Sequence, residues 1–534
     1  DGYAVYGNAG YVYITNSGTI WGKIDLTDGG GSGYLDIIAS GFVHSTLINV
    51  GNNCAATTCG VSNAGTLDMR SASGTARITG DYVGKPGSSL VLAADFAGGK
   101  GTQLTIDGDA VIEGMVDVRA TSIRNRALTL ITSTGTLKLG ASLQSSGTHL
   151  FDYAITTDSK VLQVTPRAHF AERATTLGAN EKAVAANLQS LFDGGASADA
   201  AFTRLLGVAD DAGYAAGLGS LAGQGLGAFG AFRFNSSRTF AANLYGGCQE
   251  VQLESRTADR CGWSRVLVND TTQDESADTL GYSADAFALQ TGGQLPLSDN
   301  LALTGSIAYE STKFRDESHM ARISGDSLVG GLGLLYTPAR LELSAGIDAA
   351  YGWYKSSRTI TVGLSEQASA KPEQSQIGGH VRAAYNLLDG GTTFFRPFVE
   401  GHAIHVSNKA FTEGGTSPFR LAVEAQSDTA LIGVAGVELG TKLPLSAKVT
   451  LRPFASAAIE YGSPREWTTT ARFADQPQGD SFDLTTAGPG TLGRFSIGAD
   501  ILGAKNIAVS VQYAPEFGSG FRSQSGTAKL TIAF

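Results

Sequence analysis

The sequence predicts a mainly β protein in three parts: an N-terminal parallel β-helix, a helical segment that passes through a pore, and a C-terminal 12-stranded antiparallel transmembrane β-barrel. Three observations support this. Short Gly-Thr turns recur through residues 1–167, Ala-rich stretches with helical spacing follow from about residue 175, and alternating apolar residues run from Cys261 to the end. Such alternation is typical of strands with one apolar face.

Composition excludes several classes of protein. The 534 residues include 70 Gly, only 16% are charged, and mean hydropathy is near zero. This mixture suits many short strands and turns, whereas a disordered chain would be more charged and less apolar. A net charge of -10 argues against nucleic acid as the main partner. Since no run of 18 apolar residues occurs, a transmembrane helix is excluded, but a barrel is not.

The 4 cysteines form two local pairs, Cys54 with Cys59 and Cys248 with Cys261. An even set in local pairs suits disulfides and an oxidising compartment. Zinc is the weaker alternative, because neither pair has a second Cys or His couple nearby to complete a tetrahedral site. We therefore expect two disulfides and no metal.

The stretches in residues 1–167 share a Gly-Thr turn followed by alternating apolar residues, as in "NSGTIWGKIDL" from Asn16 and "NAGTLDMRSASGTARITG" from Asn63. They read as short strands between tight bends. Irregular recurrence on this scale favours the stacked coils of a β-helix, each of which buries its inward residues on its neighbours. A β-sandwich remains the alternative.

The helical segment contains "NEKAVAANLQSLFD", "SADAAFTRLLG" and a third stretch over residues 212–244 in which small residues predominate. Small side chains allow a helix to pass through a narrow space. Each Gly also lowers helix propensity by up to about 1 kcal/mol relative to Ala. We therefore expect part of this third stretch to be loop.

Connections between the C-terminal strands alternate in length. The turns after even-numbered strands are short, as in "PLSDN" and "TPAR", while those after odd-numbered strands include long polar segments at 355–374, 408–423 and 463–491. This is the layout of an outer-membrane barrel. The twelve expected strands lie near residues 262-270, 280-296, 300-314, 321-337, 340-356, 373-389, 393-409, 424-442, 446-462, 492-502, 505-517 and 521-534.

With these parts in this order, the whole chain resembles a classical autotransporter of the type V secretion class. The most specific matches are the terminal "KLTIAF" and "NEKAVAANLQSLF...AGYAAGLGSLAGQ", which is similar to the linker before family barrels. The stretch "RALTLITSTGTLKL...HLFDYAITTDSKVLQVTPR" is similar to the end of a passenger β-helix. The resemblance implies a right-handed β-helix and four regions: a passenger stub with an autochaperone-like end at 1–167, a helical linker at 168–211, a pore-threading helix and linker at 212–260, and the barrel at 261–534.

The resemblance also implies a function. The chain would insert into the outer membrane and secrete or display its own N-terminal passenger, so that residues 1–167 lie on the cell surface. The implied partners are outer-membrane lipids and the barrel assembly machinery, with Leu530, Ile532 and Phe534 on one face of the strand used in assembly. The passenger lacks an obvious effector domain and is expected to be the stub of a longer one.

A twelve-stranded barrel leaves room for one helix and little water, so charged side chains on the polar face of its strands are expected to hold a plug. In lipid, an Arg or Lys at the midplane would cost about 2 to 4 kcal/mol. From the pore segment we expect Arg233, Asn235 and Arg238 in or near the lumen. The inward candidates on the wall are Asp348, Arg382, Arg396, Glu400, Arg452, Glu460, Arg494 and Asp500.

Other functions have weaker support. The fragment is expected to be non-enzymatic and without a cofactor. Nucleotides are not expected to supply the energy for export, because no Gly-rich phosphate loop with a Lys follows a strand. "GDSL" at 325–328 lies in an expected strand rather than a lipase-type turn. The resemblance also implies a candidate for internal chain cleavage, Asn235 before Ser236, since some family members use an Asn of the pore segment as the nucleophile; an Asn in a turn is the commoner explanation. A surface adhesin or scaffold, an esterase-type autotransporter and a diffusion porin remain alternatives.

Overall fold

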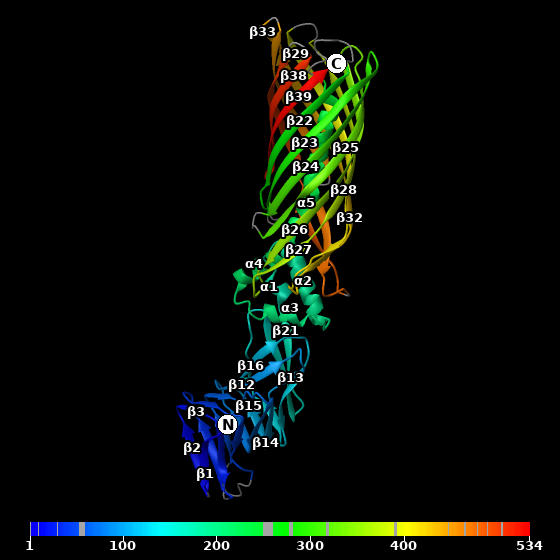
Figure 1. Ribbon diagram of the computed structural model, residues 1–534. Helices are drawn as coiled ribbons and strands as arrows, with labels where there is room; N and C mark the ends of the chain where they lie inside the picture. The colour runs from blue at the N-terminus through cyan, green and yellow to red at the C-terminus, as the bar shows by residue number, and fades with distance from the viewer. Residues whose placement is uncertain are drawn as a thin grey trace.

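The three parts lie in sequence order along one long axis, with the β-helix at one end and the barrel at the other (Figure 1). The C-terminus lies at the end of the barrel farthest from the β-helix (Figure 1). This computed structural model describes the chain except for residues 1, 9, 29, 53–58, 249–259, 277–280, 317–319, 389–391, 447, 464–465, 478, 489 and 504–505.

The N-terminal part is a β-solenoid of about five turns, so the β-helix is confirmed and the sandwich alternative is wrong. Its strands form three sheets in which neighbouring coils pair in parallel. The first sheet contains β1 (Tyr3–Asn8), β4 (Lys23–Asp28), β7 (Leu47–Asn49), β10 (Thr75–Thr79), β14 (Gln103–Asp107), β17 (Leu128–Ser133), β21 (Val161–Ala168) and β20 (Phe151–Thr157). The second contains β2 (Tyr11–Asn16), β5 (Ser32–Ile37), β8 (Gly60–Asn63), β11 (Asp81–Gly84), β15 (Ala110–Ile112) and β18 (Leu137–Leu139). The third contains β3 (Thr19–Trp21), β6 (Phe42–His44), β9 (Thr66–Asp68), β12 (Ser89–Asp95), β16 (Met115–Ser122) and β19 (Gln144–Ser145), with β13 (Lys100–Gly101) beside β12.

The interior of the solenoid consists of stacked apolar side chains. Ile24, Ile48, Ile78 and Ile106 occupy the same position in successive coils and are fully buried. Each coil therefore covers the apolar face of the next, and stability grows with every coil added. The antiparallel pair β20 and β21 closes the stack against β17.

In the described part of the connection, five helices join the solenoid to the barrel: α1 (Phe170–Arg173), α2 (Ala179–Asp193), α3 (Asp199–Leu205), α4 (Asp211–Ala222) and α5 (Gln224–Gly246). We call α1–α4 the helical base. The Asp210 side chain caps α4 by accepting a hydrogen bond from the Gly213 N–H at 2.7 Å. The expectation that part of residues 212–244 forms a loop is wrong. Only Gly223, in a left-handed conformation at φ 59°, interrupts the helix there. Burial in the narrow barrel outweighs the low helix propensity of Gly.

His169 connects α1 to the end of the solenoid. Its Nε2 lies 3.0 Å from an Asp152 oxygen and its Nδ1 lies 2.9 Å from a Glu172 oxygen. Partial burial alone would lower the pKa of His169, but the two carboxylates outweigh it and raise the pKa above the ordinary value. The protonated imidazole is thus the form that this junction stabilises.

Twelve antiparallel strands close into a barrel, as the sequence predicts. The first and last strands pair along their whole length, from Cys261 opposite Ala533 to Gln273 opposite Phe521. The strands are β22 (Cys261–Gln273), β23 (Tyr282–Ser298), β24 (Leu301–Asp316), β25 (Ala321–Tyr336), β26 (Leu341–Ile360), β28 (Glu373–Tyr385), β29 (Thr393–Asn408), β32 (Gln426–Thr441), β34 (Val449–Ser463), β37 (Thr491–Gly503), β38 (Ile507–Gly518) and β39 (Phe521–Ala533).

The two ends of the barrel differ. Tight turns, with the short strand β33 (Leu443–Ser446), lie at the end with the C-terminus, and longer connections lie toward the β-helix (Figure 1). There, β27 (Glu366–Ala370) extends the edge of β26. The segments β30 (Phe411–Thr412), β31 (Leu421–Val423), β35 (Glu466–Phe473) and β36 (Phe482–Ala487) form a separate four-stranded sheet, which we call the loop sheet.

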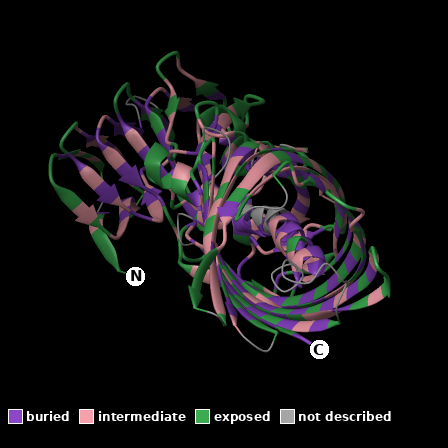
Figure 2. Ribbon diagram, turned by 90° about the horizontal axis from the view of Figure 1, so that it is seen from above, coloured by how far each residue is buried: buried purple, intermediate pink, exposed green. Residues whose placement is uncertain are grey.

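Buried and exposed residues alternate along the strands of the barrel wall (Figure 2). Apolar residues such as Ile307 and Ile347 are 66% and 64% exposed on the outside, while their strand neighbours Ser306 and Asp348 are buried inside. The outer surface is therefore an apolar band and the inner surface is polar. Of the helices that the structure describes, none combines the length and the hydropathy needed to cross a bilayer.

Candidate functional site in the barrel lumen

Helix α5 runs inside the barrel along its axis (Figure 2). It packs against the wall where β25 and β26 carry glycines. A Cβ atom on Gly331 would lie 2.7 Å from the Phe240 ring, and one on Gly346 would lie 2.9 Å from the Tyr245 ring. These glycines leave the space that the two aromatic rings of the helix occupy, so wall and helix fit each other at close range.

Arg233 is buried near the middle of the helix and is bonded to the wall on three sides. Its Nη1 donates to Glu310 at 3.0 Å and to the Ser327 hydroxyl at 2.8 Å, and its Nε donates to Gln376 at 2.9 Å. The neighbouring Ser236 also donates to Glu310. A guanidinium surrounded in this way is held in register with β24, β25 and β28.

Arg238, one and a half turns further on and 3% exposed, faces the opposite wall. It forms an ion pair with Glu460, and its Nη2 lies 2.7 Å from Glu516. Arg494 of β37 lies beside the same carboxylates, 3.3 Å from Glu460 and 3.2 Å from Glu516. The helix thus supplies one of the two cations that neutralise this pair of acids.

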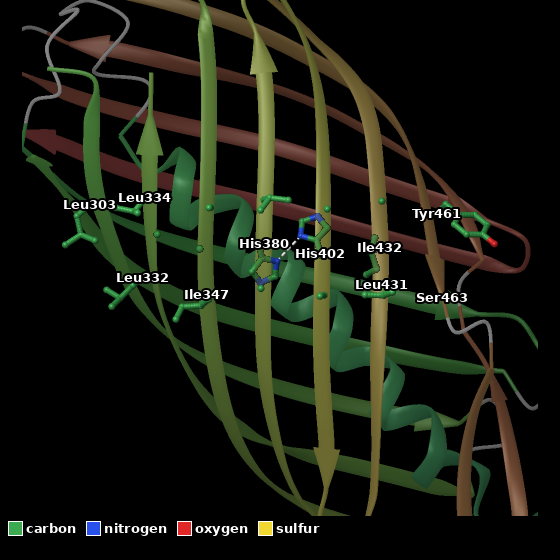
Figure 3. Close-up of a pocket in the computed structure, with 18 residues that line it drawn as sticks. Leu303, Leu332, Leu334, Ile347, His380, His402, Leu431, Ile432, Tyr461 and Ser463 are labelled. Carbon is green, nitrogen blue, oxygen red and sulfur yellow. Dashed lines mark hydrogen bonds between the residues drawn. The ribbon is translucent and has the colours of Figure 1, made fainter. Parts of the chain in front are cut away.

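A chain of polar groups surrounds Asp348. The Ser237 hydroxyl of the helix donates to Asp348 at 3.1 Å, and Asp348 also pairs with His380 Nε2. His380 Nδ1 lies 2.8 Å from His402 Nδ1 on the adjacent strand (Figure 3). Sequence reasoning missed this imidazole pair. The strands β28 and β29 form an antiparallel hairpin, and its register places His380 opposite His402 and Arg382 opposite Glu400.

The wall also carries ion pairs of its own near the C-terminal end of α5. Arg382 lies 2.7 Å from Glu342 and 3.1 Å from Glu400, and Arg452 Nε donates to Asp500 at 2.6 Å. Arg396 lies between Glu342 and Glu438, at 2.9 and 2.8 Å. Apart from Asp500, these residues line a polar cavity of about 240 Å³ beside the helix. Every wall candidate that the sequence predicted therefore lies in the lumen, and Glu310, Glu342, Glu438 and Glu516 are partners that it missed.

On the outside of the wall lies an open apolar hollow of about 1000 Å³ (Figure 3). Leu332, Ile347 and Leu431 line it, together with Gly379 and Gly401. Because these glycines have no side chains, the wall is thin there, directly outside the His380 and His402 pair.

Aromatic contacts surround the helix toward the β-helix side. Phe234 of α5 stacks on Trp467 of β35 with ring centroids 4.2 Å apart, and Phe229 packs edge-on to Tyr354 at 4.4 Å. Since Trp467 belongs to the loop sheet, an outer connection of the barrel contributes directly to the closure around the helix.

At the other end, the helix is fastened to the first and last strands of the barrel. Cys248, just after α5, forms a disulfide with Cys261 at the start of β22. Lys529 Nζ of β39 donates to the Gly246 carbonyl at 3.3 Å. The predicted disulfide between Cys248 and Cys261 is confirmed, whereas Cys54 lies outside the described residues and its pairing with Cys59 stays a prediction.

The remaining candidates have these positions. Asn235 lies within α5, so the turn expected for it is wrong, and its side-chain oxygen accepts from Arg238. Ser327 of the "GDSL" stretch lies in β25 and bonds Arg233. Leu530, Ile532 and Phe534 point outward. Among the described residues no cluster of His, Cys, Asp and Glu could hold a metal ion.

Comparison with known families identifies the barrel. The sequence model of the autotransporter β-domain family matches residues 262–514. Residues 262–514 are an autotransporter β-domain. The protein is thus a translocator of the outer membrane that secretes its N-terminal passenger, which lies on the cell surface. The translocator unit carries out transport rather than enzymatic catalysis, and a porin, an adhesin or an esterase is not favoured.

Solved autotransporter translocators are similar to this chain over the barrel. The translocator domain of NalP from Neisseria meningitidis is 16% identical, with 57% of this chain and 99% of that chain covered and a TM-score of 0.44. The β-domain of BrkA from Bordetella is 13% identical, with 52% and 100% covered and a TM-score of 0.39. The transport unit of AIDA-I from Escherichia coli is 16% identical, with 56% and 98% covered and a TM-score of 0.36. A comparison with curated protein sequences finds no match.

Proposed function

We propose that α5 is the plug that remains in the autotransporter pore once the passenger has crossed it. The observation that carries this proposal is the burial of Arg233 and Arg238 on opposite sides of one helix, each bonded to carboxylates of the barrel wall. Two buried cations with matched acids hold the helix at one depth, because a shift along the pore would leave charges unpaired. The division into passenger (1–167), linker (168–211), pore segment (212–260) and barrel (261–534) belongs to this proposal.

Residues 1–167 act in this scheme as the folding end of the passenger. Each coil that stacks outside the cell buries apolar side chains such as Leu130 and Ile131, which are fully buried. Folding thereby opposes backward movement through the pore, and no nucleotide is needed. The passenger itself has no enzymatic role in the proposal.

The experiment that tests this role is display of a Leu130→Asp variant on intact cells, measured with an antibody against an epitope in the exposed turn at residues 71–74. A charge in the stacked core should arrest folding of the coil and lower surface signal severalfold. A Thr129→Asp variant, with its side chain outside the stack, is the matched control. Equal display of all three proteins would contradict the proposal.

The same scheme requires insertion by the barrel assembly machinery, with the C-terminal strand as the segment that it recognises. Supporting this is the outward row of Leu530, Ile532 and Phe534 beside the seam between β39 and β22. Outer-membrane lipids surround that row once the barrel has closed.

A further inference from the structure

The outer face of the barrel changes from apolar to basic toward the end that carries the passenger. Strands β24, β25 and β26 pair there in continuous register, and one outward row consists of Tyr309, Leu328 and Tyr351. Trp353 lies in the next row toward the passenger, and all these side chains are exposed. Aromatic residues in such rows mark the boundary between hydrocarbon and headgroups. The outward side chains beyond Trp353 therefore lie among the headgroups of the outer leaflet.

A group of cations follows these aromatic rows on the same face. Lys313 and Lys355 lie on either side of Ser324 in one row, and Arg315 lies opposite Arg322 in the row beyond it. Because neighbouring strands are about 4.8 Å apart, Lys313 and Lys355 begin about 10 Å from each other, with Ser324 between them. We call these basic residues, Lys313, Arg315, Arg322 and Lys355, the outer basic cluster.

The carboxylates that the structure describes on this face neutralise only part of the cluster. Asp285 of β23 lies opposite Lys313 and 3.7 Å from Arg315. Asp326 lies one row nearer the bilayer and already takes part in a side-chain hydrogen bond with Tyr309. The cluster thus keeps a local excess of positive charge, on a chain whose net charge is -10.

The two arginines of the cluster oppose each other across β24 and β25. Arg322 forms no ion pair with any residue that the structure describes. Like charges directly opposite each other on neighbouring strands destabilise a sheet. An anion between Arg315 and Arg322 removes this repulsion, because each guanidinium group can donate two N–H bonds to phosphate oxygens. The arrangement therefore favours an anion that another molecule supplies.

We propose that the outer basic cluster binds the phosphate group of an anionic lipid of the outer leaflet. Arg315 and Arg322 donate to the phosphate oxygens, and Lys313 and Lys355 complete the positive surroundings. The position of the cluster favours a lipid over a soluble anion, since Lys355 is two residues, or about 7 Å, beyond Trp353. The acyl chains of the lipid then lie along the apolar band, and the bound headgroup holds this side of the barrel at one depth in the membrane.

The test uses the full-length protein, purified in a non-ionic detergent and freed of outer-membrane lipid. Phosphorylated lipid A is titrated into it, and the thermal unfolding temperature is measured, because a ligand that binds only the folded barrel raises this temperature. Lipid A without its phosphates and inorganic phosphate are titrated separately. We expect saturable stabilisation by phosphorylated lipid A, with binding of the other two at least tenfold weaker. Stabilisation by inorganic phosphate at the same concentrations would indicate a site for free anions and overturn the proposal of a lipid.

The double variant Arg315→Gln with Arg322→Gln should weaken binding of phosphorylated lipid A about tenfold for each arginine removed. Without lipid it should unfold at the temperature of the parent or higher, because the repulsion between the arginines is gone, so that lost binding is distinguished from lost folding. Arg522→Gln is the matched control and should bind the lipid as the parent does. Arg522 is exposed on β39, which β22 and β23 separate from β24. Unweakened binding by the double variant, or equal stabilisation of the parent by lipid A without phosphates, would overturn the proposal.

Discussion

Replacing Arg238 by Met removes the cation that the plug places between Glu460 and Glu516. Glu460 is buried and Glu516 is half-buried, and Arg494 alone would then face both carboxylates. Removal of one partner from a buried ion pair costs about 3 to 5 kcal/mol. Since 1.4 kcal/mol corresponds to a factor of ten, the ratio of open to plugged pores should rise roughly a hundredfold or more.

Single-channel recording of the purified protein in planar bilayers measures that ratio directly, because each departure of α5 opens a conducting path. The double variant Arg238→Met with Glu460→Gln should close the pore again. It removes one charge of each sign and leaves Arg494 with Glu516 at 3.2 Å. Loss of both partners is far less costly than loss of one.

Arg382→Met is the matched control. Arg382 lies in the lumen between Glu342 and Glu400, but the bonds it makes are to the wall and not to α5. This variant should lower the temperature at which the barrel unfolds in detergent and leave the conductance of the parent unchanged. An Arg238→Met protein that stays as closed as the parent would refute the role given to the helix charges.

Three further outcomes are expected. Replacing Cys248 and Cys261 by Ser frees the end of α5 from the first strand and should raise the frequency of brief pore openings without changing the fold. Reduction of the parent protein by dithiothreitol should have the same effect. Single-channel recordings that do not change would contradict this. Deleting Phe534 should lower the amount of folded barrel in outer membranes, measured by heat-dependent migration on gels, while Thr531→Ser should not. Because folding raises the pKa of His169, the stability that its protonated form contributes is complete below the unfolded pKa of about 6.5 and is lost as the pH rises through the folded pKa. In His169→Gln the pH dependence of the thermal unfolding temperature should therefore become flatter, by a modest amount because the side chain is about one-third exposed. An unaltered pH profile would exclude this effect.

The amino-acid sequence by itself determined the number of barrel strands and the face on which each side chain lies. Alternation with a period of two is a local property, so Asp348 and Ile347 point to opposite sides of the wall whatever lies across the lumen. The lengths of the connections likewise revealed which end of the barrel carries the loops. The register between adjacent strands also follows from the local sequence, because the connection between β28 and β29 places Arg382 opposite Glu400.

Only the tertiary structure decided which charges meet across the lumen and where the loops bind. Arg238 and Glu516 are 278 residues apart, and no local pattern relates their positions. Helicity at the glycines of the pore segment depends on the wall that encloses them, and Asn180 finds Thr485 only when a loop sheet forms beside α2. Contacts of this kind depend on how the helices, the barrel wall and the loop sheet are placed in space. The periodicity of the sequence does not encode that placement.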